Sequence, residues 1–193
     1  MFWTLPTLLT WLRILAIPVV VGVYSMTIPM SEKNAWATVL FVVVAVTDWL
    51  DGYLARRLGQ SSAFGAFLDP VADKMLVCAS LLILVQLGRV DALIALVIIG
   101  REIAISALRE WMAQIGAAQS MAVHMLGKIK TTFQLVAIPF LFWDGSLAGG
   151  LLHTRQWGTY LIYTAALLTI WSMIYYLQKA IPEIRRKANQ PRK

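Results

Sequence analysis

Residues 47–74 read TDWLDGYLARRLGQSSAFGAFLDPVADK, and they contain four of the ten acidic residues of the chain. Asp48 and Asp51 are three positions apart, and Asp69 and Asp73 are four positions apart. On α-helices, both spacings place the two carboxylates of a pair on one face. A short loop between two helices would therefore allow the two pairs of carboxylates to face each other.

The sequence around this acidic stretch is strongly apolar. The chain has 193 residues, of which 59% are hydrophobic and 14% charged, and its mean hydropathy is +0.69. A soluble domain carries about 25% charged residues, so the composition argues against a soluble globular domain and against disorder. At about 20 residues per membrane-spanning helix, the chain has room for six spans and for no separate soluble domain.

Apolar runs separated by Pro, Gly, Ser and Asp predict an all-α integral membrane protein, with residues 1–193 forming a single membrane-embedded catalytic domain. The run 156–178 is long enough to cross a bilayer alone, whereas the other spans must carry charges at their ends. An interfacial segment is predicted at 3–12, with Trp residues at headgroup level, and a basic tail at 181–193. The six predicted spans cover about 11–29, 34–57, 67–88, 91–112, 124–143 and 155–180.

The basic residues predict the orientation of these spans. With the N-terminus inside, twelve Lys and Arg lie on the cytoplasmic side, and Lys33, Arg89 and Arg155 lie outside. Both termini and the acidic stretch are therefore expected at the cytoplasmic face. The net charge of +7 has the same explanation, because basic residues gather near the anionic headgroups of membrane lipids. No nucleic-acid partner is expected.

Four carboxylates that converge near hydrocarbon repel one another unless they are protonated or neutralised by cations. Carboxylate oxygens favour hard divalent ions, so the acidic stretch predicts a site for two Mg²⁺ or Mn²⁺ ions. Gly52 and Gly65 each lie one helical turn from a carboxylate. They would let a bulky phosphate ligand approach the helix backbone closely.

A plainer alternative is that the aspartates are helix-end charges satisfied by Arg56, Arg57 and Lys74. The two pairs of matched spacing, together with the two glycines, favour a metal site over this alternative. The dipeptide Asp69-Pro70 is also typical of a helix N-terminus, where proline is tolerated at the first position.

The acidic stretch resembles the signature motif of a known family, the CDP-alcohol phosphatidyltransferases: Asp48-x-x-Asp51-Gly52-x-x-Ala55-Arg56, then eight residues, then Gly65-x-x-x-Asp69-x-x-x-Asp73. Every element of that pattern is present. Members of the family are six-helix membrane enzymes, usually dimers, that displace CMP from a CDP-linked lipid with the hydroxyl of a small alcohol. The resemblance implies a homodimer in the bacterial cytoplasmic membrane, with several spans and an active site that faces the cytoplasm.

The resemblance also implies a role for each matched residue. The metal ions would be bound by Asp48, Asp51, Asp69 and Asp73, of which Asp73 would also act as the base on the attacking hydroxyl. The pocket for the CDP-lipid would be lined by Asp48, Gly52, Ala55, Arg56 and Gly65. Two cations would offset the charge of the diphosphate, and in-line attack needs positioning more than covalent chemistry.

Basic residues in the fourth and fifth predicted spans bear on the identity of the acceptor. The segment GREIAISALREW places Arg101 and Arg109 close to one helical face, and the segment GKIKTT adds Lys128 and Lys130. An Arg inside a span is costly and is by default functional. Four cations suit an acceptor that carries a phosphate, which Arg binds in bidentate geometry and Lys as a point charge.

Internal pairing is the alternative for these cations, because Glu102 and Glu110 could neutralise the two arginines. Adjacent residues point about 100° apart on a helix, which predicts a poor direct pair between Arg101 and Glu102. Glu102 could instead reach another helix, and one of the two lysines could snorkel toward the membrane surface.

These basic segments and the opening LPTLLTWLR look like the bacterial phosphatidylglycerophosphate synthases, a branch of the family. The likeness implies that CDP-diacylglycerol and sn-glycerol 3-phosphate react to give phosphatidylglycerophosphate and CMP. Inositol phosphate, or phosphatidylglycerol in cardiolipin synthesis, are alternative acceptors for the same chemistry, and a cation transporter is a remote alternative. Within the opening segment, Thr10 and Arg13 could reach a nucleotide or lipid phosphate, or Arg13 could simply anchor at the interface.

Overall fold

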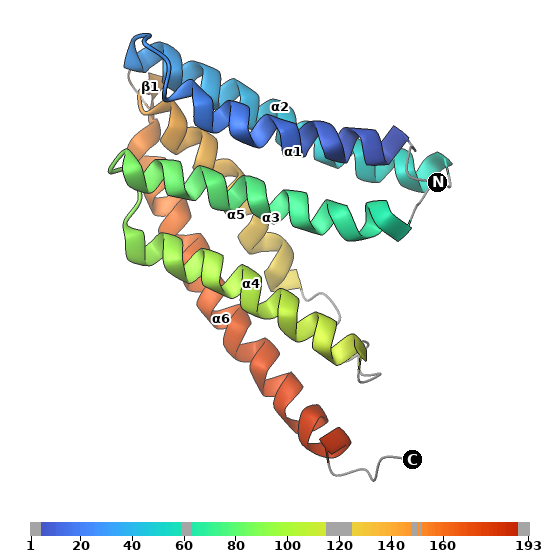
Figure 1. The fold of residues 1–193 in the computed structure, drawn as a ribbon. Coiled ribbons are helices and arrows are strands. Elements are labelled where there is room, and N and C mark those ends of the chain that lie inside the picture. Colours follow the sequence, from blue (N-terminus) through green and yellow to red (C-terminus); the bar gives the residue numbers. More distant parts are fainter. Residues whose placement is uncertain (1–4, 59–62, 115–124, 148–149, 151, 189–193) are drawn as a thin grey trace. The chain divides into compact units, whose positions relative to one another are not determined.

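The computed structural model describes residues 5–58, 63–114, 125–147, 150 and 152–188, and these form six α-helices and one short β-ribbon (Figure 1). The helices are α1 (Leu5–Val23), α2 (Met30–Leu58), α3 (Ala63–Gln86), α4 (Ala92–Gln114), α5 (Met125–Trp143) and α6 (Thr154–Ala188). The strands β1 (Ser146–Leu147) and β2 (Leu152–His153) pair antiparallel between α5 and α6. The predicted all-α fold is thus confirmed, with one helix for each predicted span.

Among the described residues, one stretch is both long and apolar enough to cross a membrane by length and composition, Thr154–Pro182 in α6. The shorter apolar stretches Thr10–Val23 and Ile129–Trp143 lie in α1 and α5. That each helix crosses a bilayer therefore stays a prediction. The same holds for the interfacial segment at 3–12, where α1 is a continuous helix from Leu5.

The contacts divide the chain into two compact units. The first contains Met1–Val90 and Leu135–Thr159, and the second contains Asp91–Gln134 and Tyr160–Lys193. In the first unit α1 packs against both α2 and α3 (Figure 1). In the second unit α4 packs against α6 through a cluster of buried and partly buried apolar side chains, Ile105, Leu108, Met112, Met173, Tyr176, Ala180 and Ile184.

Local hydrogen bonds end α3 at a sharp turn that directs the chain into α4. Gly88 has a φ of 65°, in the left-handed region that favours glycine, and its N–H donates to the carbonyl of Val85. The next N–H, that of Arg89, donates to the carbonyl of Leu84 over 2.9 Å. These bonds satisfy carbonyls that a helix end would leave without partners.

The start of α3 differs from the prediction. The helix begins at Ala63, before the predicted start at residue 67, and Pro70 lies inside it rather than in its first turn. Proline has no N–H, so the carbonyl of Ala66 loses its usual helical donor. The preference of proline for the first position is local, and here the packing of α3 against α1 outweighs it.

The distribution of side chains is inverted relative to a soluble protein. Leu12, Leu96 and Trp171 are each more than half exposed, whereas Arg13 and Lys130 are buried. In soluble proteins, large apolar surfaces are uncommon and charged residues are almost never buried without a partner. Lipid around the helices would solvate the apolar side chains and favour polar groups that face the interior.

Candidate active site

Two contacts join α1 to the acidic pair of α3 in the first unit. The hydroxyl of Thr10 donates a hydrogen bond to Oδ1 of Asp69, and Nη1 of Arg13 lies 2.6 Å from Oδ1 of Asp73. Thr10 and Arg13 are about one turn apart on α1, and Asp69 and Asp73 are about one turn apart on α3. The two contacts thus follow the same order along both helices. The two helices therefore run parallel, as the ribbon shows (Figure 1).

The burial of these side chains is uneven. Thr10 and Arg13 are 0% and 2% exposed, whereas the side chain of Asp73 is 48% exposed. Asp69 is partly buried, and Gly65, one turn before it on α3, is buried. The first unit thus presents two carboxylates at an accessible face of α3, each held by a buried group of α1.

The helical conformation predicted for both acidic pairs is confirmed, since Asp48 and Asp51 lie in α2 and Asp69 and Asp73 in α3. For several other predicted members of the site, the structure describes the helical backbone but not the side chain. These are Asp48, Asp51, Gly52, Ala55, Arg56 and, on α5, Lys128.

The second unit brings the remaining predicted cations together around one glutamate. Nη1 of Arg101 lies 3.3 Å from Oε1 of Glu102, and Nζ of Lys130 donates to the same oxygen. Arg101 and Lys130 are 5% and 3% exposed. The expectation that the adjacent Arg101 and Glu102 would pair poorly is wrong, because the long side chains of Arg101 and of Lys130 on α5 both reach the same carboxylate oxygen of Glu102. Glu102 also links two helices, as the alternative interpretation allowed.

Helix α6 supplies two partners that sequence reasoning did not identify. Nη2 of Arg109 donates to the hydroxyl of Tyr176 over 3.1 Å, and Nη2 of Arg101 donates to Oγ of Ser172 over 3.0 Å. The guanidinium carbons of Arg101 and Arg109 lie 5.7 and 5.3 Å from the centroid of the Tyr176 ring, within cation–π range. Ser172 and Tyr176 are four positions apart, a spacing that could have marked a shared polar face.

Two donors of this basic cluster have no acceptor among the described residues. The Nε atoms of Arg101 and Arg109 are both buried, and neither has a hydrogen-bond partner there. A buried donor without an acceptor costs about 1–3 kcal/mol, so an anionic ligand that accepted from it would bind favourably. The cluster is therefore suited to a small phosphate-bearing ligand.

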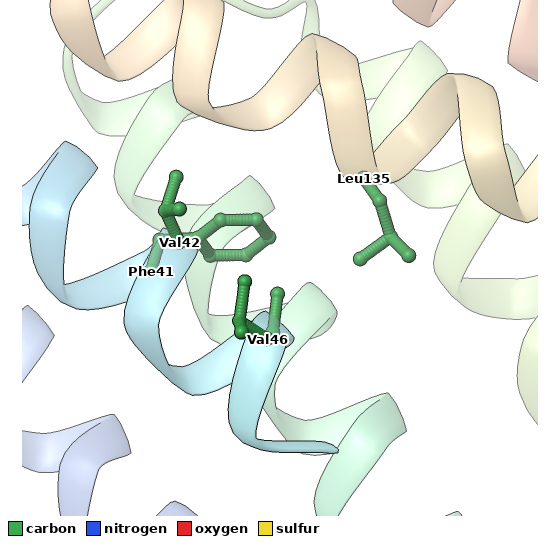
Figure 2. Close-up of a pocket in the computed structure, with 5 residues that line it drawn as sticks. Phe41, Val42, Val46 and Leu135 are labelled. Carbon is green, nitrogen blue, oxygen red and sulfur yellow. The ribbon is translucent and has the colours of Figure 1, made fainter. Parts of the chain in front are cut away.

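Apolar pockets occur where α2 passes α5 in the first unit. One, of about 280 Å³, is lined by Phe41, Val42, Ala45 and Val46 of α2 and by Leu135 of α5 (Figure 2). The labelled side chains of the two helices project toward the same space in that view. Val46 lies two positions before Asp48 in the chain. The pocket offers an apolar surface on the helix that carries the first acidic pair.

Residues 3–171 match the model of the family described as CDP-alcohol phosphatidyltransferase. The chain is 45% identical over 182 residues to a protein of Escherichia coli strain K12 named CDP-diacylglycerol--glycerol-3-phosphate 3-phosphatidyltransferase, covering 93% of this chain and 96% of that protein. Relatives of the same name from Shigella flexneri serotype 5b and Shigella sonnei have the same identity and coverage. With the acidic pairs on α2 and α3, these matches show that the chain belongs to the CDP-alcohol phosphatidyltransferase family.

Proposed function

We propose that this chain transfers a phosphatidyl group from CDP-diacylglycerol to sn-glycerol 3-phosphate, giving phosphatidylglycerophosphate and CMP. The observation that carries the proposal is the 45% identity, over nearly the full length of both chains, to relatives that are named for this reaction. Two features of the structure support it independently. The acidic pairs on α2 and α3 would bind the cations that a lipid diphosphate needs, and the basic cluster on α4, α5 and α6 would bind a phosphorylated alcohol.

Two Mg²⁺ or Mn²⁺ ions would be held by Asp48, Asp51, Asp69 and Asp73. The described members fit this role, since Asp69 and Asp73 offer hard carboxylate oxygens one turn apart on α3 and are not fully buried. When bound, the ions would offset the charge of the diphosphate and of the departing CMP.

The residues of the chain would then position the reactants and move one proton. Asp73 accepts the proton of the acceptor hydroxyl, whose oxygen forms a bond to the phosphorus attached to diacylglycerol. The bond between that phosphorus and the oxygen of CMP breaks, and CMP leaves with the electron pair. The residues proposed to hold the CDP-lipid are Asp48, Gly52, Ala55, Arg56 and Gly65. Holding both substrates in line supplies most of the acceleration in such a step.

The phosphate of the acceptor would bind at Arg101, Arg109, Lys128 and Lys130. The buried Nε donors of Arg101 and Arg109 support this assignment, as do the contacts from Tyr176 that orient both guanidinium groups. Glu102 would balance the cations while no anion is bound and would hold Arg101 and Lys130 in place.

The enzyme would lie in the bacterial cytoplasmic membrane as a homodimer with six spans per chain. Both termini and the active site would face the cytoplasm. The exposed apolar side chains and buried charged ones support the membrane location. The apolar pocket lined by Val46 would suit the acyl region of a lipid substrate, because its lining is apolar and lies mostly on α2, the helix that carries the first acidic pair (Figure 2).

The direct test is release of CMP from CDP-diacylglycerol by the purified protein in the presence of Mg²⁺. Glycerol 3-phosphate, inositol phosphate, phosphatidylglycerol, serine and no acceptor are compared in parallel, and Asp73→Asn serves as the inactive control. We expect release with glycerol 3-phosphate alone and none from the variant. Release with another acceptor would preserve the aspartate site and reject the assignment of the basic cluster. No release with any acceptor would reject the proposed transferase activity and favour the alternative of a cation transporter.

The acceptor assignment has its own test in Arg109→Ala. If Arg109 binds the acceptor phosphate, the KM for glycerol 3-phosphate should rise far more than the KM for CDP-diacylglycerol. Equal changes in both constants would reject the role of Arg109 and leave the reaction itself standing.

A further inference from the structure

Helix α1 holds buried side chains against two carboxylates of α3. We infer that Arg13 is a positioning residue for Asp73, and that Thr10 positions Asp69 in the same way. This inference rests on the proposed function, because it assigns to α1 the task of fixing the carboxylates that would act on the acceptor and the metals. It differs from the expectation that Thr10 and Arg13 contact a substrate phosphate themselves.

The register of the two helices is the first argument. Thr10 meets Asp69 and Arg13 meets Asp73, so two successive turns of α1 align with two successive turns of α3. A single ion pair could form by chance at a helix crossing. Two contacts in the same order require parallel helices at one fixed longitudinal offset. That offset also fixes where both carboxylates of α3 lie along the axis of α1.

The uneven burial of the Arg13–Asp73 pair is the second argument. The side chain of Arg13 is 1% exposed, while that of Asp73 is 48% exposed. Packing around Arg13 therefore fixes the guanidinium, and the carboxylate is the partner that could otherwise change rotamer. A charge-assisted hydrogen bond of 2.6 Å to Oδ1 selects one orientation of the Asp73 side chain before substrate arrives.

Charge is the third argument. Carboxylates that gather at one site repel each other, and the guanidinium of Arg13, with Nη1 2.6 Å from Oδ1 of Asp73, places a positive charge beside them. Nη1 of Arg13 is already committed to Asp73, and the Arg13 side chain is only 1% exposed. The geometry therefore favours positioning over substrate binding.

The test compares four variants in the full-length enzyme: Arg13→Gln, Arg13→Lys, Thr10→Val and Arg155→Gln. Arg155→Gln is the matched control, since it removes an Arg–Asp pair of 3.7 Å at an exposed position of the first unit. Steady-state CMP release gives kcat and both KM values for each variant. Misplacement of a reacting group by about 1 Å costs about 100-fold, so we expect kcat of Arg13→Gln to fall by about 10- to 100-fold.

The split between kcat and KM separates positioning from binding. We expect both KM values of Arg13→Gln to stay within about threefold of wild type, and Arg13→Lys to recover part of kcat because it keeps the charge but not the planar fork. Thr10→Val should lower kcat by a smaller factor, and Arg155→Gln should leave kcat unchanged. A rise in the KM for CDP-diacylglycerol at normal kcat would make Arg13 a substrate ligand and overturn the inference.

A thermal measurement tests the pair without using activity. The Tm shifts of Arg13→Gln and Asp73→Asn should not add in the double variant, because either change alone already removes the interaction. Additive shifts, or normal kcat in folded Arg13→Gln, would overturn the inference. If Arg13→Gln does not fold, Arg13→Lys and Thr10→Val decide it by the same kcat criterion. Wild-type protein that releases no CMP would contradict the proposed function instead, and the Tm cycle would still test the pair.

Discussion

Arg89 donates a hydrogen bond from Nη2 to Oδ1 of Asn34 over 2.9 Å, and both residues are 7% exposed. The same guanidinium donates from Nη1 to the carbonyls of Leu141 and Phe142 over 3.1 and 2.9 Å, and it lies 3.1 Å from the carboxylate of Asp144. These carbonyls belong to the last turn of α5, where no helical N–H follows to satisfy them. One side chain thus joins α2, the turn after α3 and the end of α5.

This arrangement predicts that Arg89→Gln is strongly destabilising. Removal of one partner of a buried ion pair costs about 3–5 kcal/mol, because the remaining groups stay desolvated without compensation. The free energy of unfolding in detergent micelles checks the value. Arg155→Gln, which removes the more exposed ion pair to Asp144, should cost less than about 1 kcal/mol. Equal losses in the two variants would contradict the central role of Arg89.

The close approach of α5 and α6 predicts that Gly158→Ala is destabilising. A Cβ at Gly158 would lie 2.7 Å from Cγ and 3.1 Å from the backbone N of Leu141. Overpacking of this kind costs about 1–3 kcal/mol, measured by unfolding in micelles. Gly100→Ala is the control, since a Cβ there meets nothing within 4 Å and should stabilise α4 by up to about 1 kcal/mol. A stable Gly158→Ala variant would show that the helices can separate at little cost.

Neutralising Glu102 should destabilise the second unit. Glu102→Gln leaves Lys130 buried without its anion, and we expect a loss of about 3 kcal/mol in unfolding free energy. Adding Lys130→Met should recover part of that loss, because an apolar side chain then replaces the unpaired cation. Glu110→Gln on the exposed face of α4 should change stability by no more than about 0.5 kcal/mol. A double variant less stable than Glu102→Gln would argue against the pairing.

The hydroxyl of Tyr176 should matter for acceptor binding more than for folding. Tyr176→Phe keeps the ring in its apolar cluster and removes the hydroxyl that accepts a 3.1 Å hydrogen bond from Arg109. A lost hydrogen bond of about 0.5–1.5 kcal/mol predicts a rise of about two- to tenfold in the KM for glycerol 3-phosphate. Steady-state kinetics measure this, with Tyr175→Phe as the neighbouring control. An unchanged KM would remove Tyr176 from the acceptor site.

Removal of divalent ions should stop the reaction reversibly. The carboxylates proposed as ligands would bind Mg²⁺ or Mn²⁺, so EDTA should abolish CMP release and excess metal should restore it. Thermal unfolding adds an independent measurement, since CDP-diacylglycerol should raise Tm more when a divalent ion is present. Full activity in the chelator would end the metal proposal.

The number and approximate positions of the helices follow from local properties of the sequence, although α1 ends at Val23 rather than at residue 29 and α6 continues to Ala188 rather than ending at residue 180. Apolar runs, prolines and glycines mark the elements, and the spacing of Asp48, Asp51, Asp69 and Asp73 alone places each pair on one helical face. The local rule failed at the start of α3, where the preference of Pro70 for a first turn was overridden by packing against α1. The motif was likewise readable without a structure, because its residues are close in the chain.

The partners of the charged side chains depended on tertiary structure. Arg13 and Asp73 are 60 positions apart, and Arg89 and Asn34 are 55 apart. Periodicity shows which face of a helix is polar, but the register between two helices depends on how their side chains interlock. Arg89 could be counted as a loop charge from the sequence, whereas packing makes it a buried link between three elements. Long-range pairing was therefore decided by the fold, because no local pattern in the sequence reports the longitudinal offset between two helices.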